Sequence, residues 1–153
     1  VTLMGAVFSD CASLTTVPLF NTSNVTLMVA MFSDCVYLTT VPLFDTSKVT
    51  NMASMFYNCF SLTTVPLFDT SNVTSMADMF CNCSSLKSIL MTGMKASFDI
   101  SASTKFEETD LVTILNNLAT VTTATTLTMG ATNLAKLTDA DKLIATNKGW
   151  TLA

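Results

Sequence analysis

The sequence predicts an α/β repeat fold: a right-handed solenoid of parallel strands and short helical segments, with an α/β cap at its C-terminal end. One phrase is written three times at a fixed interval of 24 residues, as "VPLFNTSNVT" at 17–26, "VPLFDTSKVT" at 41–50 and "VPLFDTSNVT" at 65–74. A period of this length is typical of a solenoid, in which each coil covers the apolar face of its neighbour. One such coil has room for a strand and one short helical or 3₁₀ segment, and 153 residues suffice for a core.

Single apolar residues keep the same interval, which indicates that the coils stack in register. Because a stacked coil repeats the same buried environment, each of these residues is expected to form a ladder through the core. We expect parallel strands centred near residues 14–17, 38–41, 62–65 and 86–89. The repeating residues are Met4, Met28, Met52 and Met76; Phe8, Phe32, Phe56 and Phe80, all predicted to be buried; Leu14, Leu38, Leu62 and Leu86; and Phe20, Phe44 and Phe68.

The third coil shows the spacing expected of the strand. Leu62, Val65 and Leu67 follow an L-x-x-L-x-L pattern, and their side chains are predicted to face inward. Pro66 has no N–H to donate, so it is expected at the end of the strand or outside the ladder. The side chains predicted to face outward are those of Thr63, Thr64 and Pro66.

The residues after each strand predict a turn followed by a short helix. The "DTSN" stretch at 69–72 supplies side chains that cap and turn the backbone. In "VTSMADMF" at 73–80, apolar residues lie at i, i+3, i+6 and i+7, which is the stripe of a short helix or 3₁₀ turn. This segment is therefore expected to form a helical layer on the strands.

The repeated pattern "MFxxCxxLTTVPLFDTSNVTxM" resembles the BspA-like leucine-rich repeats, in the F-D-T-S-N-V-T-x-M variant that is common in bacterial surface proteins. The resemblance covers residues 1 to about 92. It implies a leucine-rich-repeat solenoid in an extracellular or cell-surface interaction protein, and it carries over no catalytic residues. Related repeats also occur in phage-borne structural proteins and in secreted proteins of some protists, so the resemblance does not fix the source.

The chain is expected to divide into a repeat array at 1–92 and a capping segment at 93–153. The array holds four 24-residue coils, the first incomplete, because Val1 aligns with Val25, Val49 and Val73. This alignment predicts that the 153 residues are the C-terminal part of a longer chain, or that another subunit covers the first coil. The elements expected in the cap are a strand at 96–101, a helix at 107–119, a strand at 125–130, a helix with Thr138 at its N-cap, Asp141 at N3 and Gly149 at C′, and a short strand at "WTL".

Five cysteines raise the question of a metal or redox site. Four of them, Cys11, Cys35, Cys59 and Cys83, keep the 24-residue interval and are expected to stack as a ladder of reduced, buried thiols. A disulfide between adjacent coils stays open on distance alone. Cys81 stands outside the ladder and is expected to be more exposed. The chain has no His and lacks the usual spacing of zinc ligands, so we expect no metal and no cofactor.

Charge is scarce, which limits the partners. Only 12% of the residues are charged, the net charge is −4 and the pI is about 4.4. There is no basic patch to neutralise phosphates, so nucleic acid is not expected as a partner. No apolar run approaches the roughly 18 residues that would span a membrane, so membrane insertion is not expected.

These observations favour a non-enzymatic interaction or adhesion module, extracellular or on a cell surface, with a protein or glycan partner. Enzymatic activity is not expected, because no His, no Gly-rich phosphate loop and no G-x-S-x-G motif is present. The alternative is a structural component of a phage virion, such as a fibre, tail or capsid decoration protein, for which a homo-oligomer is the expected assembly. The predicted contact residues lie on the outer strand face, with Tyr37 and Tyr57 nearby: Thr15, Thr16, Thr39, Thr40, Thr63 and Thr64.

Overall fold

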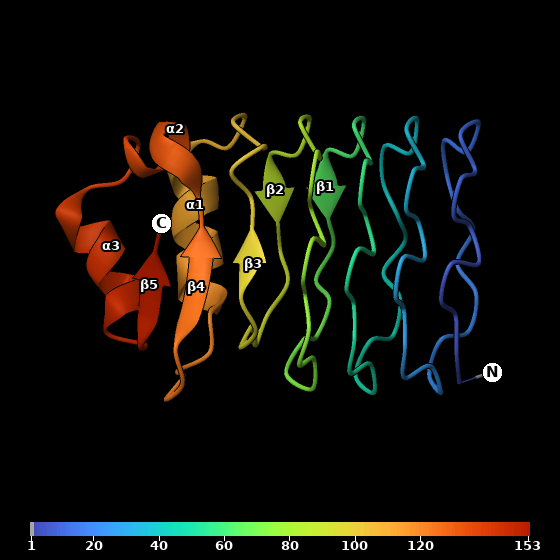
Figure 1. Cartoon of the computed structure of the whole chain (residues 1–153), viewed down its shortest axis with the longest axis horizontal. Coiled ribbons are helices and arrows are strands. Elements are labelled where there is room, and N and C mark those ends of the chain that lie inside the picture. Colours follow the sequence, from blue (N-terminus) through green and yellow to red (C-terminus); the bar gives the residue numbers. More distant parts are fainter. Residues whose placement is uncertain (1) are drawn as a thin grey trace.

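The computed structural model describes residues 2–153, so the expectation about Val1 lies outside the described residues. Stacked coils follow one another along the longest axis, and the helices gather at the C-terminal end (Figure 1). We call residues 2–92 the array and residues 93–153 the cap. The elements are β1 (Thr64–Val65), β2 (Ser88–Ile89), β3 (Phe98–Asp99), α1 (Glu108–Asn117), β4 (Thr125–Thr128), α2 (Gly130–Leu134), α3 (Asp139–Thr146) and β5 (Trp150–Leu152).

One face of the array is a main-chain ladder between residues 24 apart. Parallel bridges join Leu3 to Leu27, Leu27 to Asn51 and Asn51 to Ser75. Each coil also donates N–H groups to carbonyl oxygens of the next, as Met52 does to Ser75 at 3.0 Å. We call this side the bridge face. It pairs the same backbone groups at every coil, which is why the chain repeats its sequence at that interval.

The other face carries the predicted strands. β1 and β2 pair in parallel, with Thr64 opposite Ser88 and Val65 opposite Ile89. The preceding coils continue this face through single main-chain bonds, such as Thr63 N–H to the Thr39 carbonyl at 3.0 Å. The parallel pairing agrees with the sequence prediction, although the regular strands are shorter than expected. The right-handed course of the coil stays a prediction.

Of the two alternatives predicted at 73–80, a short helix or a 3₁₀ turn, the helix does not form. The segment is a series of turns, one of them closed by the Met79 N–H donating to the Met76 carbonyl at 3.2 Å. Two residues of each coil adopt the left-handed backbone conformation: in the third coil Ser54 has φ 55° and Asn58 has φ 58°, and in the fourth Asp78 has φ 54° and Asn82 has φ 62°. A left-handed residue ends a right-handed helix at once. The apolar stripe therefore packs inward from a turning backbone and not from a helix.

Two phenylalanine ladders run through the core as predicted. Phe32 and Phe56 stack with ring centroids 5.8 Å apart and planes 5° apart, and Phe56 and Phe80 repeat this at 6.1 Å and 7°. These three side chains are fully buried. Phe8, also predicted to be buried, is only half-buried, because within the described residues a neighbouring coil packs on one side of it only. The second ladder joins Phe20, Phe44 and Phe68.

The cysteine ladder links neighbouring coils by hydrogen bonds. All five cysteines are free thiols. Cys59 donates its Sγ proton to the carbonyl oxygen of Phe32 at 3.1 Å, and Cys83 does the same to Phe56 at 3.0 Å. Burial raises the pKa of Cys35 to about 11 and that of Cys83 to about 12. These buried thiols are therefore structural, and Cys81 is more exposed than the buried Cys35, Cys59 and Cys83, as expected. Cys11 was predicted to be buried with them but is only half-buried, because it lies in the first coil.

The cap replaces the strand face by helices. β3, β4 and β5 form a parallel sheet in that order, and their arrows run opposite to those of β1 and β2 in Figure 1. α1 packs against β2 and α3, so it lies where the array would place its next strand. The predicted strands and both predicted helices of the cap are present within a few residues of their expected bounds, whereas α2 was not foreseen.

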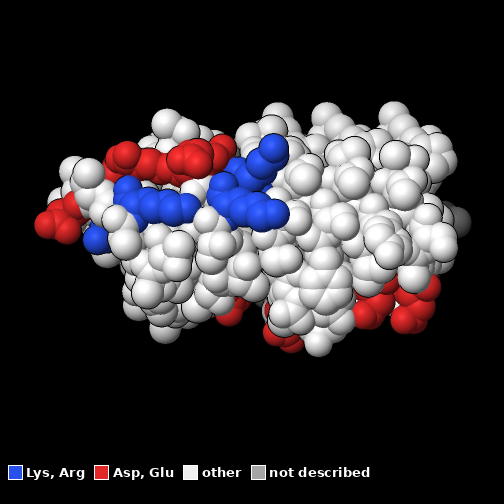
Figure 2. Space-filling view, turned by 90° about the horizontal axis from the view of Figure 1, so that it is seen from above, with Lys and Arg blue, Asp and Glu red and all other residues white. Residues whose placement is uncertain are grey.

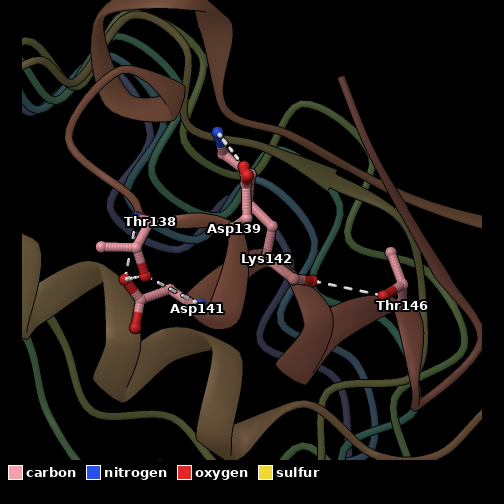
Figure 3. A network of polar contacts seen from close by, with 5 residues as sticks. All are labelled: Thr138, Asp139, Asp141, Lys142 and Thr146. Carbon is pink, nitrogen blue, oxygen red and sulfur yellow. Dashed lines mark hydrogen bonds and ion pairs between the residues drawn. The ribbon is translucent and has the colours of Figure 1, made fainter.

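Local chemistry fixes the start of α3 as the sequence predicts. Thr138 and Asp141 form a reciprocal capping box, in which the Asp141 N–H donates to Thr138 Oγ1 at 3.2 Å and the Thr138 N–H donates to Asp141 Oδ2 at 2.9 Å (Figure 3). Gly149 has φ 85°, but it lies one position later than predicted, because Asn147 is the C-cap residue. Trp150 follows it, buried, and donates Nε1–H to the Ala119 carbonyl at 2.9 Å.

The bridge face is interrupted where the array meets the cap. In the third coil the N–H groups of Met52, Ser54 and Phe56 donate to the fourth coil at 2.8–3.1 Å. Among the described residues, the equivalent N–H groups of the fourth coil have no hydrogen-bond acceptor; they belong to Met76, Asp78 and Phe80. Phe98 packs edge-on against Phe80 at this point, with ring planes 74° apart, which ends the parallel stack. We call this interruption the seam.

Candidate interaction surface

The predicted threonines form two columns on the strand face. In the first column Thr39 donates its hydroxyl to the Thr15 carbonyl at 3.3 Å, and Thr63 donates to the Thr39 carbonyl at 3.1 Å. The coil stacking thus already uses these donors. The second column keeps its hydroxyls free of hydrogen bonds to the described residues; it consists of Thr16, Thr40 and Thr64.

Exposure differs along the predicted surface. Thr15, Thr16, Thr39 and Thr40 are exposed, whereas Thr63 and Thr64 are half-buried. Of the two tyrosines expected nearby, Tyr37 is 63% exposed, while Tyr57 is half-buried in a turn whose carbonyl accepts from Asp34. The structure therefore brings the threonines together as columns and leaves Tyr57 outside them.

A column of exposed leucines borders the threonines, and the sequence reasoning missed it. Leu19, Leu43 and Leu67 are 68%, 56% and 56% exposed. The prediction that Leu67 faces inward is therefore wrong. The Phe68 N–H donates to the Pro66 carbonyl at 2.7 Å, a tight turn that shifts the alternation by one residue and sends Phe68 inward instead. We call these three residues the leucine column.

Shallow hollows separate the rungs of the leucine column. The hollow between Leu43 and Leu67 has a volume of about 350 Å³. The hollow between Leu19 and Leu43 has a volume of about 470 Å³. Each is lined by a leucine, the following phenylalanine and the Asx-Thr-Ser turn of one coil, and by the leucine and Asp of the next.

At least one Asp side chain lines each hollow. Asp45 Oδ1 accepts from the N–H and the hydroxyl of Ser47, at 3.1 and 2.7 Å, and Asp69 Oδ1 accepts from the Ser71 N–H at 2.9 Å. These hydrogen bonds lower the pKa of both carboxyls, so both are ionised at neutral pH. Oδ2 of each makes no hydrogen bond or ion pair within residues 2–153. The equivalent residue of the first coil is Asn21, which forms the same turn.

Charge is distributed unevenly over the molecule. Figure 2 shows lysines and acids gathered over the C-terminal half, while the visible surface of the array is largely uncharged except for acidic groups along one edge. Among the described residues no three His, Cys, Asp or Glu side chains are placed to hold a metal ion. None of the helices in residues 2–153 has the length and apolarity that crossing a bilayer requires.

Comparison with known proteins places this geometry in a family. The model of the family described as "Mycoplasma protein of unknown function, DUF285" matches residues 2–138. The chain belongs to this family. Among solved structures, this chain is similar to a leucine-rich repeat protein of T. pallidum. The two share 17% identity and a TM-score of 0.57, over the whole of this chain and 79% of that one. That likeness shows a leucine-rich-repeat-like fold. No curated protein matches the chain.

Proposed function

We propose that the chain is a non-enzymatic interaction module of the BspA-like kind, built as a right-handed solenoid and displayed outside the cell or on its surface. The leucine column carries this proposal. The second and third coils bury their repeated Met, Phe, Cys and Val residues almost completely, yet each of the first three coils leaves one leucine of the column more than half exposed. Exposed apolar patches of this kind mark sites of association more often than they serve the stability of the monomer.

The repeated surface favours many weak contacts over one tight site. The first three coils each offer an exposed leucine and a threonine hydroxyl without a partner in the described residues, and a hollow lies between each neighbouring pair of these leucines. A single set contributes little affinity, but several sets engaged together gain from effective concentration. The partner is a protein or a glycan carried on a surface. A structural role in a phage virion is the alternative.

Binding of monomeric and multimerised protein to bacterial and host cells tests the proposal. We expect the multimer to bind at least about tenfold more tightly than the monomer, because linked weak contacts add. A matched multimer with Thr16, Thr40 and Thr64 changed to Val measures how much the hydroxyls contribute. If neither form binds any cell surface, the surface role is wrong, and assembly with virion proteins becomes the explanation to test.

A further inference from the structure

The leucine column and the carboxylates beside it form one composite surface. Asp45 lines both hollows, and Asp69 lines the hollow between Leu43 and Leu67. Parallel strands lie about 4.8 Å apart, so successive leucines and successive carboxylates follow one another at about that interval. The result is an apolar ridge with a row of negative charge along one side.

Neither carboxylate of this surface forms an ion pair within residues 2–153. Asp45 raises the pKa of Asp69, the smallest of the effects on that carboxyl, because the two like charges repel. Lys48 is the cation that acts on Asp45, but its Nζ donates to Asn24 at 2.9 Å. A partner that brings its own cations therefore gains on both carboxylates at once.

We propose that this surface binds a peptide segment that carries both aliphatic and basic side chains. The aliphatic side chains fill the hollows between the leucines, and Lys or Arg of the segment donates to Oδ2 of Asp45 and Asp69. This inference rests on the proposed interaction function and names the partner's chemistry. The neutral threonine columns alone predict binding that hardly responds to salt, whereas the carboxylates predict binding that weakens as salt is added.

The first coil shows which substitution removes the charge and keeps the turn. Asn21 holds in the first coil the same turn that Asp45 and Asp69 hold in the next two. Asp45→Asn and Asp69→Asn therefore remove charge and keep the turn. Asp78→Asn is the matched control, because Asp78 is an exposed acid of the same array, and its left-handed backbone tolerates Asn. For the apolar part, Leu43→Ser is matched by Leu143→Ser, since these leucines are 56% and 55% exposed.

The probe is a short fluorescent peptide of alternating leucine and lysine, titrated with the full chain at several salt concentrations. Matched peptides replace lysine by glutamate or leucine by serine. We expect binding of the first peptide only, weakened about tenfold by Leu43→Ser, since burying one leucine is worth about that factor. Each Asp→Asn change is expected to weaken binding about twofold to fivefold at low salt and to flatten the salt dependence. The Asp78 and Leu143 variants should bind as the unchanged protein does.

Three results would overturn the inference. One is equal binding of the lysine and glutamate peptides, and another is equal loss in the control variants. The third is self-association that Leu43→Ser abolishes, which assigns the surface to a second copy. If the multimer binds cells and the Leu43 and Asp45 variants bind them equally well, this inference fails while the interaction function stands. If the peptide binds as expected and no cell surface is bound, this inference stands and the proposed role at a cell surface fails.

Discussion

The array and the cap are held together by different kinds of bonds. In the array, each coil repeats the main-chain ladder, the phenylalanine stack and the thiol-to-carbonyl bond of the one before. In the cap, single side chains do comparable work: Lys148 donates Nζ protons to the carbonyl oxygens of Leu115, Asn116 and Leu118 at the end of α1. Stability in the array is therefore spread over equivalent positions, whereas in the cap it depends on particular residues.

The largest effect is expected from the centre of the array. Phe56→Ala leaves a cavity between two stacked rings and should lower the free energy of unfolding by about 3–5 kcal/mol. Phe8→Ala, at the equivalent position of the half-buried first coil, should cost about half as much. Urea titration of both variants measures the difference. Equal losses of stability in the two variants would mean that Phe56 gains nothing from its second neighbouring ring, which contradicts a continuous stack.

Raising the pH should weaken the array through its buried thiols. The pKa of Cys35 is raised from 9.0 to about 11, so the unfolded chain releases this proton first. Stability is therefore fully present below about pH 9 and is lost as the pH rises through the folded value. Each such thiol contributes a slope of at most about 1.4 kcal/mol per pH unit. Denaturant titrations between these two pH values should show a loss of roughly 2–3 kcal/mol from Cys35 alone, to which the other buried thiols add, and a flat profile contradicts the buried ladder.

The seam predicts a local difference in amide exchange between neighbouring coils. The N–H groups of Met76 and Phe80 lack the acceptors that serve Met52 and Phe56. We expect the fourth-coil amides to exchange at least about tenfold faster, a difference of about 1.4 kcal/mol in protection. Residue-resolved hydrogen exchange by NMR compares the pairs within one sample. Equal protection would show that the ladder continues into the cap.

The smallest effect is expected at the capping box of α3. Thr138→Ala removes the acceptor for the Asp141 N–H and should cost about 1 kcal/mol. Thr138→Ser keeps the hydroxyl and serves as the control. Thermal unfolding followed by circular dichroism measures both variants. A neutral Thr138→Ala would mean that packing of α3 on α1 fixes the helix without its cap.

Much of the fold follows from periodicity alone, because stacking requires equal residues at equal positions. The buried ladders of Phe32, Phe56 and Phe80 and the parallel β1–β2 pair are of this kind. The helix expected at 73–80 failed because an apolar i, i+3 stripe fits a series of turns as well as it fits a helix. The left-handed residue within 73–80 is Asp78, and it was the available signal, since Asp tolerates the left-handed backbone.

The candidate site was harder to predict than the fold. The threonine columns could be named from the strand pattern, although nothing in that pattern showed that the hydroxyls of Thr39 and Thr63 already donate to the backbone. The leucine column was not predicted, because the turn at Pro66 shifts the alternation of inward and outward side chains by one residue. Such a local shift depends on backbone geometry that the L-x-x-L-x-L spacing does not contain.

The equal ladders on the two sides of each coil have a genetic consequence. A coil in the array donates to its predecessor the same bond that it accepts from its successor: the Thr50 N–H donates to the Thr26 carbonyl, and the Thr50 carbonyl accepts from the Thr74 N–H. Inserting or deleting one whole coil, 24 codons in frame, would therefore add or remove a complete set of these bonds and leave no backbone group unpaired beyond those of the seam. Each such step would change the length of the array by about 4.8 Å and leave the cap unchanged.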